Sequence, residues 1–303
     1  MSINPKDMKR IMNSPYRLLA PVERLLLENN DANTGDRDIL HLHPSEICKK
    51  DWCPRSSYYK IIGLPEKPRS FTLQTLNVFA EGHLIHEKWQ KWLTEAGVLE
   101  QAEVPIYNEE HRIMGHADGI VSDKKGRAVL EIKSVGVGTV RFEDYGLFAP
   151  YSRKEISLDE LWASIKFPFA SHIRQAQLYM YCLGIDEGLL LYEWKASQDV
   201  REFSIQYQPE LVEPILASCL TVVRALQDDT VPVRPSWLDQ DHRVCKSCSY
   251  KEYCYESNIE QGSTRPNGEV SIEVRPSRQT SAGDSNNPRE PRRVVRQQTD
   301  ESL

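Results

Sequence analysis

The amino-acid sequence predicts a folded α/β protein on three observations: helical periodicity, short β-prone runs, and enough apolar residues to build a core. Hydrophobic residues make up 40% of the 303-residue chain, which is sufficient for a globular fold. Residues 72–97 carry apolar side chains at helical spacing and close with a glycine, where helices commonly stop. Residues 102–135 then switch to short β-prone runs broken at "NEE" and "DKKG", the pattern of a meander.

Further elements extend this mixture of helices and strands on both sides. The segment 171–184 predicts a helix with Ser171 as its cap and Gly184 as its stop. The other expected elements are helices at residues 22–30 and 209–229 and a strand at residues 188–197. No internal repeat is evident in the sequence.

The chain divides unevenly along its length. We expect an N-terminal helical segment at residues 1–44, a main domain at residues 45–259 and a disordered tail at residues 260–303. The tail has no aromatic residue, repeats proline, and interleaves arginine with acidic residues. Such a segment cannot bury enough apolar surface to offset the entropy lost on ordering.

Apolar patterning and net charge narrow the class of protein. No apolar run approaches the roughly 18 residues that a membrane helix needs, and the N-terminus lacks the uninterrupted apolar segment of a secretory signal. We therefore expect a cytoplasmic protein without a membrane partner. The net charge of −6 has the wrong sign for a protein that coats nucleic acid indiscriminately. A net negative charge is still compatible with a local basic groove that binds nucleic acid beside an acidic metal site.

Three ionisable residues, Asp118, Glu131 and Lys133, stand in a stretch that otherwise has the pattern of sheet core. If residues 113–120 and 128–134 are paired strands, alternation puts Glu131 and Lys133 on one face, with Asp118 opposite them. Two carboxylates brought together repel, and a cation between them would relieve that cost. Hard oxygen ligands suit Mg²⁺ or Mn²⁺, and the lysine could act on a water or a phosphate. The alternative is a surface hairpin whose Glu131 and Lys133 form an ordinary ion pair of little worth.

This Asp and Glu-x-Lys pattern resembles the PD-(D/E)XK nuclease superfamily, and the surrounding residues extend the resemblance to its RecB-like branch. In that branch a helix before the hairpin supplies a histidine ligand, and a helix after it carries a glutamine and a tyrosine. The segments "EGHLIHEKW" and "RQAQLYMY" offer these residues. The candidates are His86, with His83 as a rival one turn earlier, and Gln175 with Tyr179 or, in the other register, Gln177 with Tyr181.

The resemblance implies a restriction-endonuclease-like core, with a central mixed sheet flanked by helices. It also implies that His86, Asp118, Glu131 and the backbone carbonyl of Ile132 bind Mg²⁺ or Mn²⁺. Lys133 would act on the attacking water or the phosphate, while Gln175 and Tyr179 position the strand. The candidates for backbone-phosphate contacts are Arg55, Lys60, Lys88 and Lys91.

Cysteine spacing provides a second signal, because the chain has seven cysteines and disulfides are rare in the cytoplasm. Cys245, Cys248 and Cys254 form a C-x2-C-x5-C cluster, close enough in sequence to hold three corners of one metal centre. A fourth thiolate would come from Cys53 or Cys48, nearly 200 residues earlier. Zinc and an iron-sulfur cluster both suit four cysteines, and spacing alone does not separate them.

One early cysteine followed by a compact late triplet resembles the iron-sulfur nucleases, namely AddB-type helicase-nuclease subunits and CRISPR-associated RecB-like exonucleases. In that group the first cysteine stands beside an arginine, as Cys53 and Arg55 do in "CPRSSYYK". The resemblance implies a [4Fe-4S] cluster on Cys53, Cys245, Cys248 and Cys254 that clips the N- and C-terminal parts together. Cys182 and Cys219 have the pattern of core residues. The long connection at residues 137–170 is expected to be a lid, a substrate wall or a decorative insertion.

The expected function is a Mg²⁺- or Mn²⁺-dependent DNA exonuclease of recombination, repair or end processing, acting on single-stranded or duplex DNA ends. Its compact size would suit a phage or mobile-element enzyme. One alternative is a DNA-binding or assembly factor that keeps the nuclease fold and works through a helicase, an integrase or a CRISPR-adaptation partner. The other is a zinc-stapled structural protein whose Glu-x-Lys pattern is coincidental.

Overall fold

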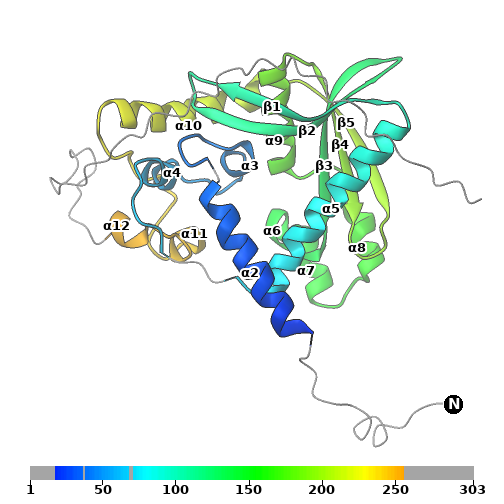
Figure 1. Ribbon diagram of the computed structural model, residues 1–303, viewed down its shortest axis with the longest axis horizontal. Helices are drawn as coiled ribbons and strands as arrows, with labels where there is room; N and C mark the ends of the chain where they lie inside the picture. The colour runs from blue at the N-terminus through cyan, green and yellow to red at the C-terminus, as the bar shows by residue number, and fades with distance from the viewer. Residues whose placement is uncertain (1–17, 37, 68–70, 256–303) are drawn as a thin grey trace, which may run out of the picture. The chain divides into compact units, whose positions relative to one another are not determined.

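A five-stranded mixed sheet in the order β1-β2-β3-β4-β5 forms the centre of the computed structural model, which describes residues 18–36, 38–67 and 71–255 (Figure 1). All neighbouring strands are antiparallel except β3 and β4, which are parallel. The strands are β1 (Leu99–Asn108), β2 (Ile113–Asp123), β3 (Gly126–Val135), β4 (Glu187–Trp194) and β5 (Val200–Gln206). The expected central mixed sheet flanked by helices is therefore confirmed.

The hairpin of β2 and β3 is confirmed in the expected position. Its pairs run from Asp123↔Gly126 at the turn to Gly119↔Leu130. Gly126 has a φ of 132°, a conformation that residues with a β-carbon rarely adopt. The sequence pattern did not predict β5, an edge strand whose residues alternate between exposed and half-buried.

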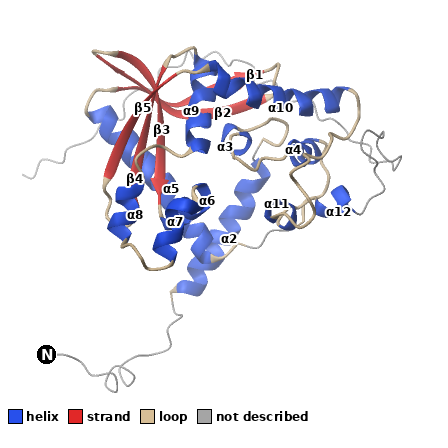
Figure 2. Ribbon diagram, turned by 180° about the vertical axis from the view of Figure 1, so that it is seen from behind, coloured by secondary structure: helices blue, strands red, loops and turns tan. Residues whose placement is uncertain are grey.

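Helices cover both faces of this sheet (Figure 2). On one face Ile85 of α5 packs against Leu130 and Ile132, and on the other Leu178 of α9 packs in one cluster with Val129. Before the sheet lie α2 (Leu19–Asp36), α3 (Pro44–Ile47), α4 (Pro54–Ile61) and α5 (Leu73–Glu95). After β3 come α6 (Val137–Glu143), α7 (Tyr145–Ser152), α8 (Leu158–Ser164) and α9 (Ala170–Leu183), and after β5 α10 (Pro209–Gln227), α11 (Arg243–Lys246) and α12 (Lys251–Tyr255).

Local sequence signals account for the ends of two long helices. The Thr72 hydroxyl accepts a hydrogen bond from the amide of Thr75 and caps α5, which ends before Gly97 at a φ of 72°. Gly184 ends α9 in the left-handed conformation, as expected. Ser171, however, is not the cap of α9. The helix begins one residue earlier, and the Ser171 hydroxyl instead donates to Glu143 Oε2 at 2.7 Å.

The connection between β3 and α9 is part of the core, so it is neither a lid nor a decoration. A parallel pair of strands needs a long crossover, and residues 136–186 supply it with α6 to α9. Val140, Leu161 and Trp162 are buried there against Tyr192 and Trp194 of β4. The apolar face of this connection therefore covers one end of the sheet.

The expected tail at residues 260–303 lies outside the described residues. Among the helices that are described, none is long and apolar enough to cross a lipid bilayer.

Candidate functional site

Asp118 and Glu131 lie next to each other where the β2–β3 hairpin opens. They come one step past the last paired residues of the two strands, Gly119↔Leu130, so their side chains project from the same face. The amide of Ile132 donates to Asp118 Oδ2 at 2.5 Å, which fixes that carboxylate toward β3. Asp118 Oδ1 lies 3.2 Å from His86 Nδ1 on α5. The structure thus brings His86, Asp118 and Glu131 to one end of the hairpin.

Glu131 is 1% exposed and forms an ion pair with Lys133 through Oε1. Its other oxygen, Oε2, is buried and has no hydrogen-bond partner among the described residues. Burial raises the pKa of Glu131 to about 7 against the lowering effect of the Lys133 charge, and the nearby Asp118 charge raises it further. This carboxylate is therefore costly to keep ionised with the surrounding protein groups alone.

The neighbouring cations respond to the same two carboxylates. Burial lowers the pKa of His86, but the hydrogen bond to Asp118 and the Asp118 charge together raise it above its usual value. Burial likewise lowers the pKa of Lys133, and Glu131 and Asp118 more than compensate, so Lys133 stays protonated. In the described part of the chain no three His, Cys, Asp or Glu side chains close around one point as metal ligands. Instead, the side chains are paired with one another, His86 with Asp118 and Lys133 with Glu131.

A hydrogen-bond chain links Lys133 to α9. Lys133 Nζ donates to Gln175 Oε1 at 3.1 Å, and Gln175 Nε2 donates to the Tyr179 hydroxyl at 3.0 Å. Gln175 and Tyr179 are one turn apart on α9 and both are buried. The structure therefore brings this pair, and not the other register, to Lys133.

The rival candidates point elsewhere. Gln177 Nε2 donates to the Gln206 carbonyl at 2.7 Å, and its Oε1 accepts from the Gln208 amide, so it ties α9 to the end of β5. Tyr181 is 37% exposed. His83, one turn before His86, is exposed and has no contact with Asp118 among those described. Only the packing of α5 and α9 on the sheet distinguishes these candidates.

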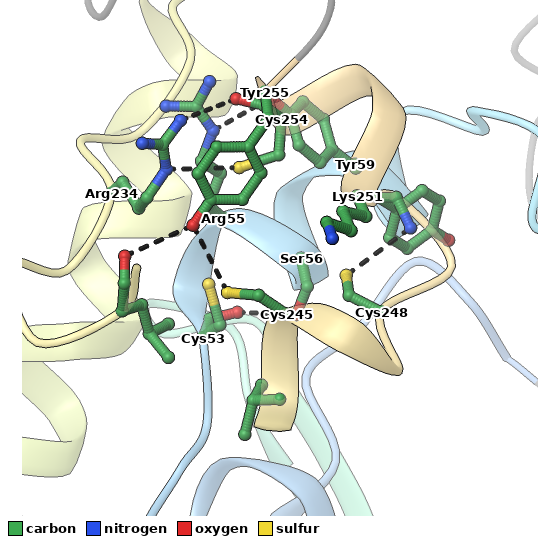
Figure 3. Close-up of a pocket in the computed structure, with 13 residues that line it drawn as sticks. Cys53, Arg55, Ser56, Tyr59, Arg234, Cys245, Cys248, Lys251, Cys254 and Tyr255 are labelled. Atoms are coloured by element: carbon green, nitrogen blue, oxygen red, sulfur yellow. Dashed lines mark hydrogen bonds between the residues drawn. The ribbon is translucent and has the colours of Figure 1, made fainter. Parts of the chain in front are cut away.

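Four cysteines line one pocket between α4 and the short helices α11 and α12 (Figure 3). Cys53 precedes α4, while Cys245, Cys248 and Cys254 come from the last part of the described chain. Cys48 does not line this pocket. It is 1% exposed in the core, and its carbonyl accepts a hydrogen bond from Arg174 Nε at 2.8 Å.

Hydrogen-bond donors point at three of these sulfurs (Figure 3). Arg234 Nε lies 3.4 Å from Cys254 Sγ, and the Tyr255 hydroxyl lies 3.4 Å from Cys245 Sγ. The amide of Tyr250 donates to Cys248 Sγ at 3.4 Å. Donors of this kind stabilise thiolate sulfur and are common around cysteine-ligated metals. The sequence pattern did not single out Arg234 or Tyr255, because neither belongs to the cysteine spacing.

Burial dominates the electrostatics of the fourth cysteine. It raises the pKa of Cys53 to about 11, although the backbone amides of Ser56 and Arg55 favour the thiolate. The other two cysteines behave as core residues: Cys219 is fully buried and Cys182 packs against the same cluster.

The expected phosphate contacts are only partly compatible with the structure. Arg55 is 1% exposed and donates to the Tyr59 hydroxyl and the Pro232 carbonyl, so its assignment as a phosphate contact is wrong. It connects α4 to the segment that follows α10 through the Pro232 carbonyl, and it also lines the four-cysteine pocket. The other candidates each have a carboxylate within 4 Å: Lys60 has Glu46, Lys88 has Glu193 and Lys91 has Glu95.

No protein-family model and no curated protein matches the chain. Among solved structures, SSO0001 is 17% identical, with a TM-score of 0.44, over 77% of this chain and 95% of its own. An alkaline exonuclease from Laribacter hongkongensis is 12% identical, with a TM-score of 0.40, over 62% and 89%. A phage-related exonuclease from Haemophilus somnus 129PT is 14% identical, with a TM-score of 0.32, over 57% and 80%. These likenesses are too distant to carry a functional inference, which rests on the site itself.

Proposed function

We propose that the protein is a metal-dependent nuclease that hydrolyses phosphodiester bonds of DNA. The observation that carries the proposal is the buried Glu131 Oε2, which has no hydrogen-bond partner in the described structure and lies beside a second carboxylate, Asp118. A buried anionic oxygen without a partner is costly, and a bound cation would remove that cost. Lys133 pairs with the other oxygen of Glu131, so a positive charge that could stabilise a phosphate lies at the same carboxylate.

The donor atoms at this position suit a hard divalent cation, although in the described structure they are paired with neighbouring protein groups. His86, Asp118 and Glu131, with the backbone carbonyl of Ile132, would hold it, and carboxylate and carbonyl oxygens suit Mg²⁺ or Mn²⁺. When bound, such an ion polarises a phosphoryl oxygen and lowers the pKa of a water. The Ile132 amide keeps Asp118 turned toward the site by its 2.5 Å hydrogen bond.

Lys133 would supply the second charge. Its ammonium group contacts both Glu131 Oε1 and Gln175 Oε1, so its position is restrained from two sides. From there it can orient the attacking water or stabilise negative charge that develops on the phosphate. Gln175 is restrained in turn by Tyr179, and the pair is suited to positioning the strand.

The proposed substrate is a DNA end, and the proposed setting is recombination, repair or end processing. The order of His, Asp, Glu-x-Lys and Gln-x-x-x-Tyr along the chain supports this assignment. The proposed site has one metal position next to one restrained lysine. These two groups are sufficient for metal-assisted hydrolysis of one phosphodiester bond at a time.

We also propose that Cys53, Cys245, Cys248 and Cys254 hold a [4Fe-4S] cluster, with zinc as the alternative. All four line one pocket, and hydrogen-bond donors reach three of the sulfurs. Four thiolates with such donors fit either metal centre. Its role would be structural, because it would join segments almost 200 residues apart in sequence, where closing a long loop costs most entropy.

End-labelled single-stranded and duplex DNA incubated with the purified full-length chain would test the nuclease assignment. Cleavage is expected with Mg²⁺ or Mn²⁺ and not with EDTA, and the Glu131→Gln variant should be inactive. The matched control is Glu193→Gln, because Glu193 is also a buried carboxylate paired with a lysine, yet it lies against α5. Cleavage by the Glu131→Gln variant would refute the assignment.

DNA binding without cleavage would favour the other candidate function, an assembly factor that needs a helicase or integrase partner. Absence of both binding and cleavage would leave only a structural role for the four-cysteine pocket. These outcomes are separated by measuring binding to the same labelled DNA by fluorescence anisotropy.

A further inference from the structure

His172 lies one turn before Gln175 on α9, and its hydrogen bonds determine where its proton sits. His172 Nδ1 is 2.5 Å from the Tyr192 hydroxyl, and the Phe169 amide donates to that same hydroxyl at 2.9 Å. Among the described residues, Nδ1 is the one acceptor within reach of the tyrosine's own proton, so the hydroxyl donates to Nδ1 while its oxygen accepts from the amide. The tautomer assigned by this network therefore accepts at Nδ1 and carries its hydrogen on Nε2.

The surroundings keep this imidazole neutral. Burial lowers the pKa of His172 well below its usual value, and the Lys133 charge lowers it further. Burial raises the pKa of Tyr192 far above the neutral range, so the tyrosine retains the proton that it donates. His172 is thus a neutral N–H donor whose orientation is set by Tyr192.

The strand register places this donor beside the proposed site. Tyr192 on β4 pairs with Lys133 on the parallel strand β3, so both side chains project from the same face. On α9, His172 shares a face with Gln175 and Tyr179 at helical spacing, and Gln175 contacts Lys133. The imidazole is half-buried, and no described residue accepts a hydrogen bond from its Nε2.

We propose that His172 is a DNA-contacting residue that donates its Nε2–H to a non-bridging phosphate oxygen of the bound strand. The inference rests on the proposed nuclease function, since it needs a phosphodiester at Lys133. A neutral donor suits this position because a second cation would be repelled by Lys133. A phosphate oxygen is the acceptor that the bound strand would present beside the lysine.

Two substitutions separate the hydrogen bond from a packing role. The amide nitrogen of His172→Gln reaches the place of Nε2, whereas the amide of His172→Asn reaches only the place of Nδ1. We expect His172→Asn to lower kcat/KM by roughly 10- to 100-fold, which is the factor that a hydrogen bond to a charged group supplies. His172→Gln should lower kcat/KM only about threefold. Both variants should keep the wild-type Mn²⁺ affinity. His172→Gln leaves the Tyr192 hydroxyl without its acceptor, so it should melt at a lower temperature than His172→Asn and yet retain the higher kcat/KM. The matched control is His83→Asn, an exposed histidine on α5.

Two further measurements keep this inference distinct from the nuclease assignment. Nitrogen-15 spectra of the histidine rings should show His172 as the neutral Nε2–H tautomer throughout the neutral pH range. Binding of labelled DNA, measured by anisotropy in the Glu131→Gln background, should show the same difference between the Asn and Gln variants. Equal losses in both variants, a protonated ring or an Nδ1–H tautomer would overturn the role of His172. If the two variants differ in DNA binding as expected but the wild type never cuts DNA, only the nuclease assignment would be overturned.

Discussion

Replacing Glu131 by glutamine should remove cleavage and at the same time raise stability in EDTA at alkaline pH. The structure provides the magnitude, because burial raises the pKa of this carboxyl from 4.5 to about 7. At about 1.4 kcal/mol per pKa unit, the ionised carboxylate costs the folded state roughly 3 kcal/mol. This shift already includes the attraction of Lys133, and glutamine resembles the protonated carboxyl in shape and charge, so an increase of about 1 to 3 kcal/mol in the free energy of unfolding is expected.

The pH dependence has a definite sign. Below about pH 4.5 the carboxyl is protonated in both folded and unfolded chains, so the wild type has no penalty. As the pH rises toward 7, the unfolded chain releases the proton first, and the stability of the wild type falls. The glutamine variant has no such proton at position 131, so its advantage should grow from near zero at about pH 4 to its full value at about pH 8.

Calorimetry or urea denaturation in EDTA at several pH values would measure this effect. A gain of 1 to 3 kcal/mol corresponds to an increase of about 2 to 6 °C in melting temperature for a chain of this size. The control Glu193→Gln breaks a pairing in which Lys88 and Trp89 both donate to the carboxylate, so it should lose stability. A Glu131→Gln variant that is less stable than wild type at pH 8, or that still cuts DNA, would refute this reasoning.

Lys133→Ala should lower kcat strongly while calorimetric titration shows nearly unchanged Mn²⁺ affinity, because an ammonium group cannot ligate a cation; loss of metal binding would contradict its role. Anaerobically purified protein should be brown, with iron and sulfide in about equal amounts as a [4Fe-4S] centre requires. Cys53→Ser should bleach and destabilise it while Cys48→Ser is mild, and colourless protein with one zinc would instead favour the alternative metal. Arg234→Gln should speed metal loss to a chelator by about 10- to 100-fold, because Arg234 donates to both the sulfur and the carbonyl of one cysteine. The control Arg243→Gln removes a nearby charge that pairs with a carboxylate and contacts no sulfur; equal rates in the two variants would exclude the proposed role.

Local sequence was sufficient for the hairpin and for several helix ends. Strand alternation sets which side chains share a face whatever surrounds them, so Glu131 and Lys133 could be placed together from the sequence. The ends of α5 before Gly97 and of α9 at Gly184 follow from the backbone freedom of glycine, which depends on few neighbours. The cap assigned to Ser171 failed because Glu143, distant in sequence, accepts its hydroxyl.

Where the sequence offered two equally suitable residues for one position in a site, only the tertiary structure distinguished them. His83 and His86 differ by one helical turn, and only the packing of α5 on the hairpin directs His86 to Asp118. In the same way, Cys53 meets the C-terminal cysteines while Cys48 enters the core, although both flank the same short loop. Nothing near Tyr192 in the sequence indicates that it orients His172, because that contact joins a strand to a helix through the fold. Periodicity determines the face on which a residue lies, whereas the partner across that face is set by long-range packing.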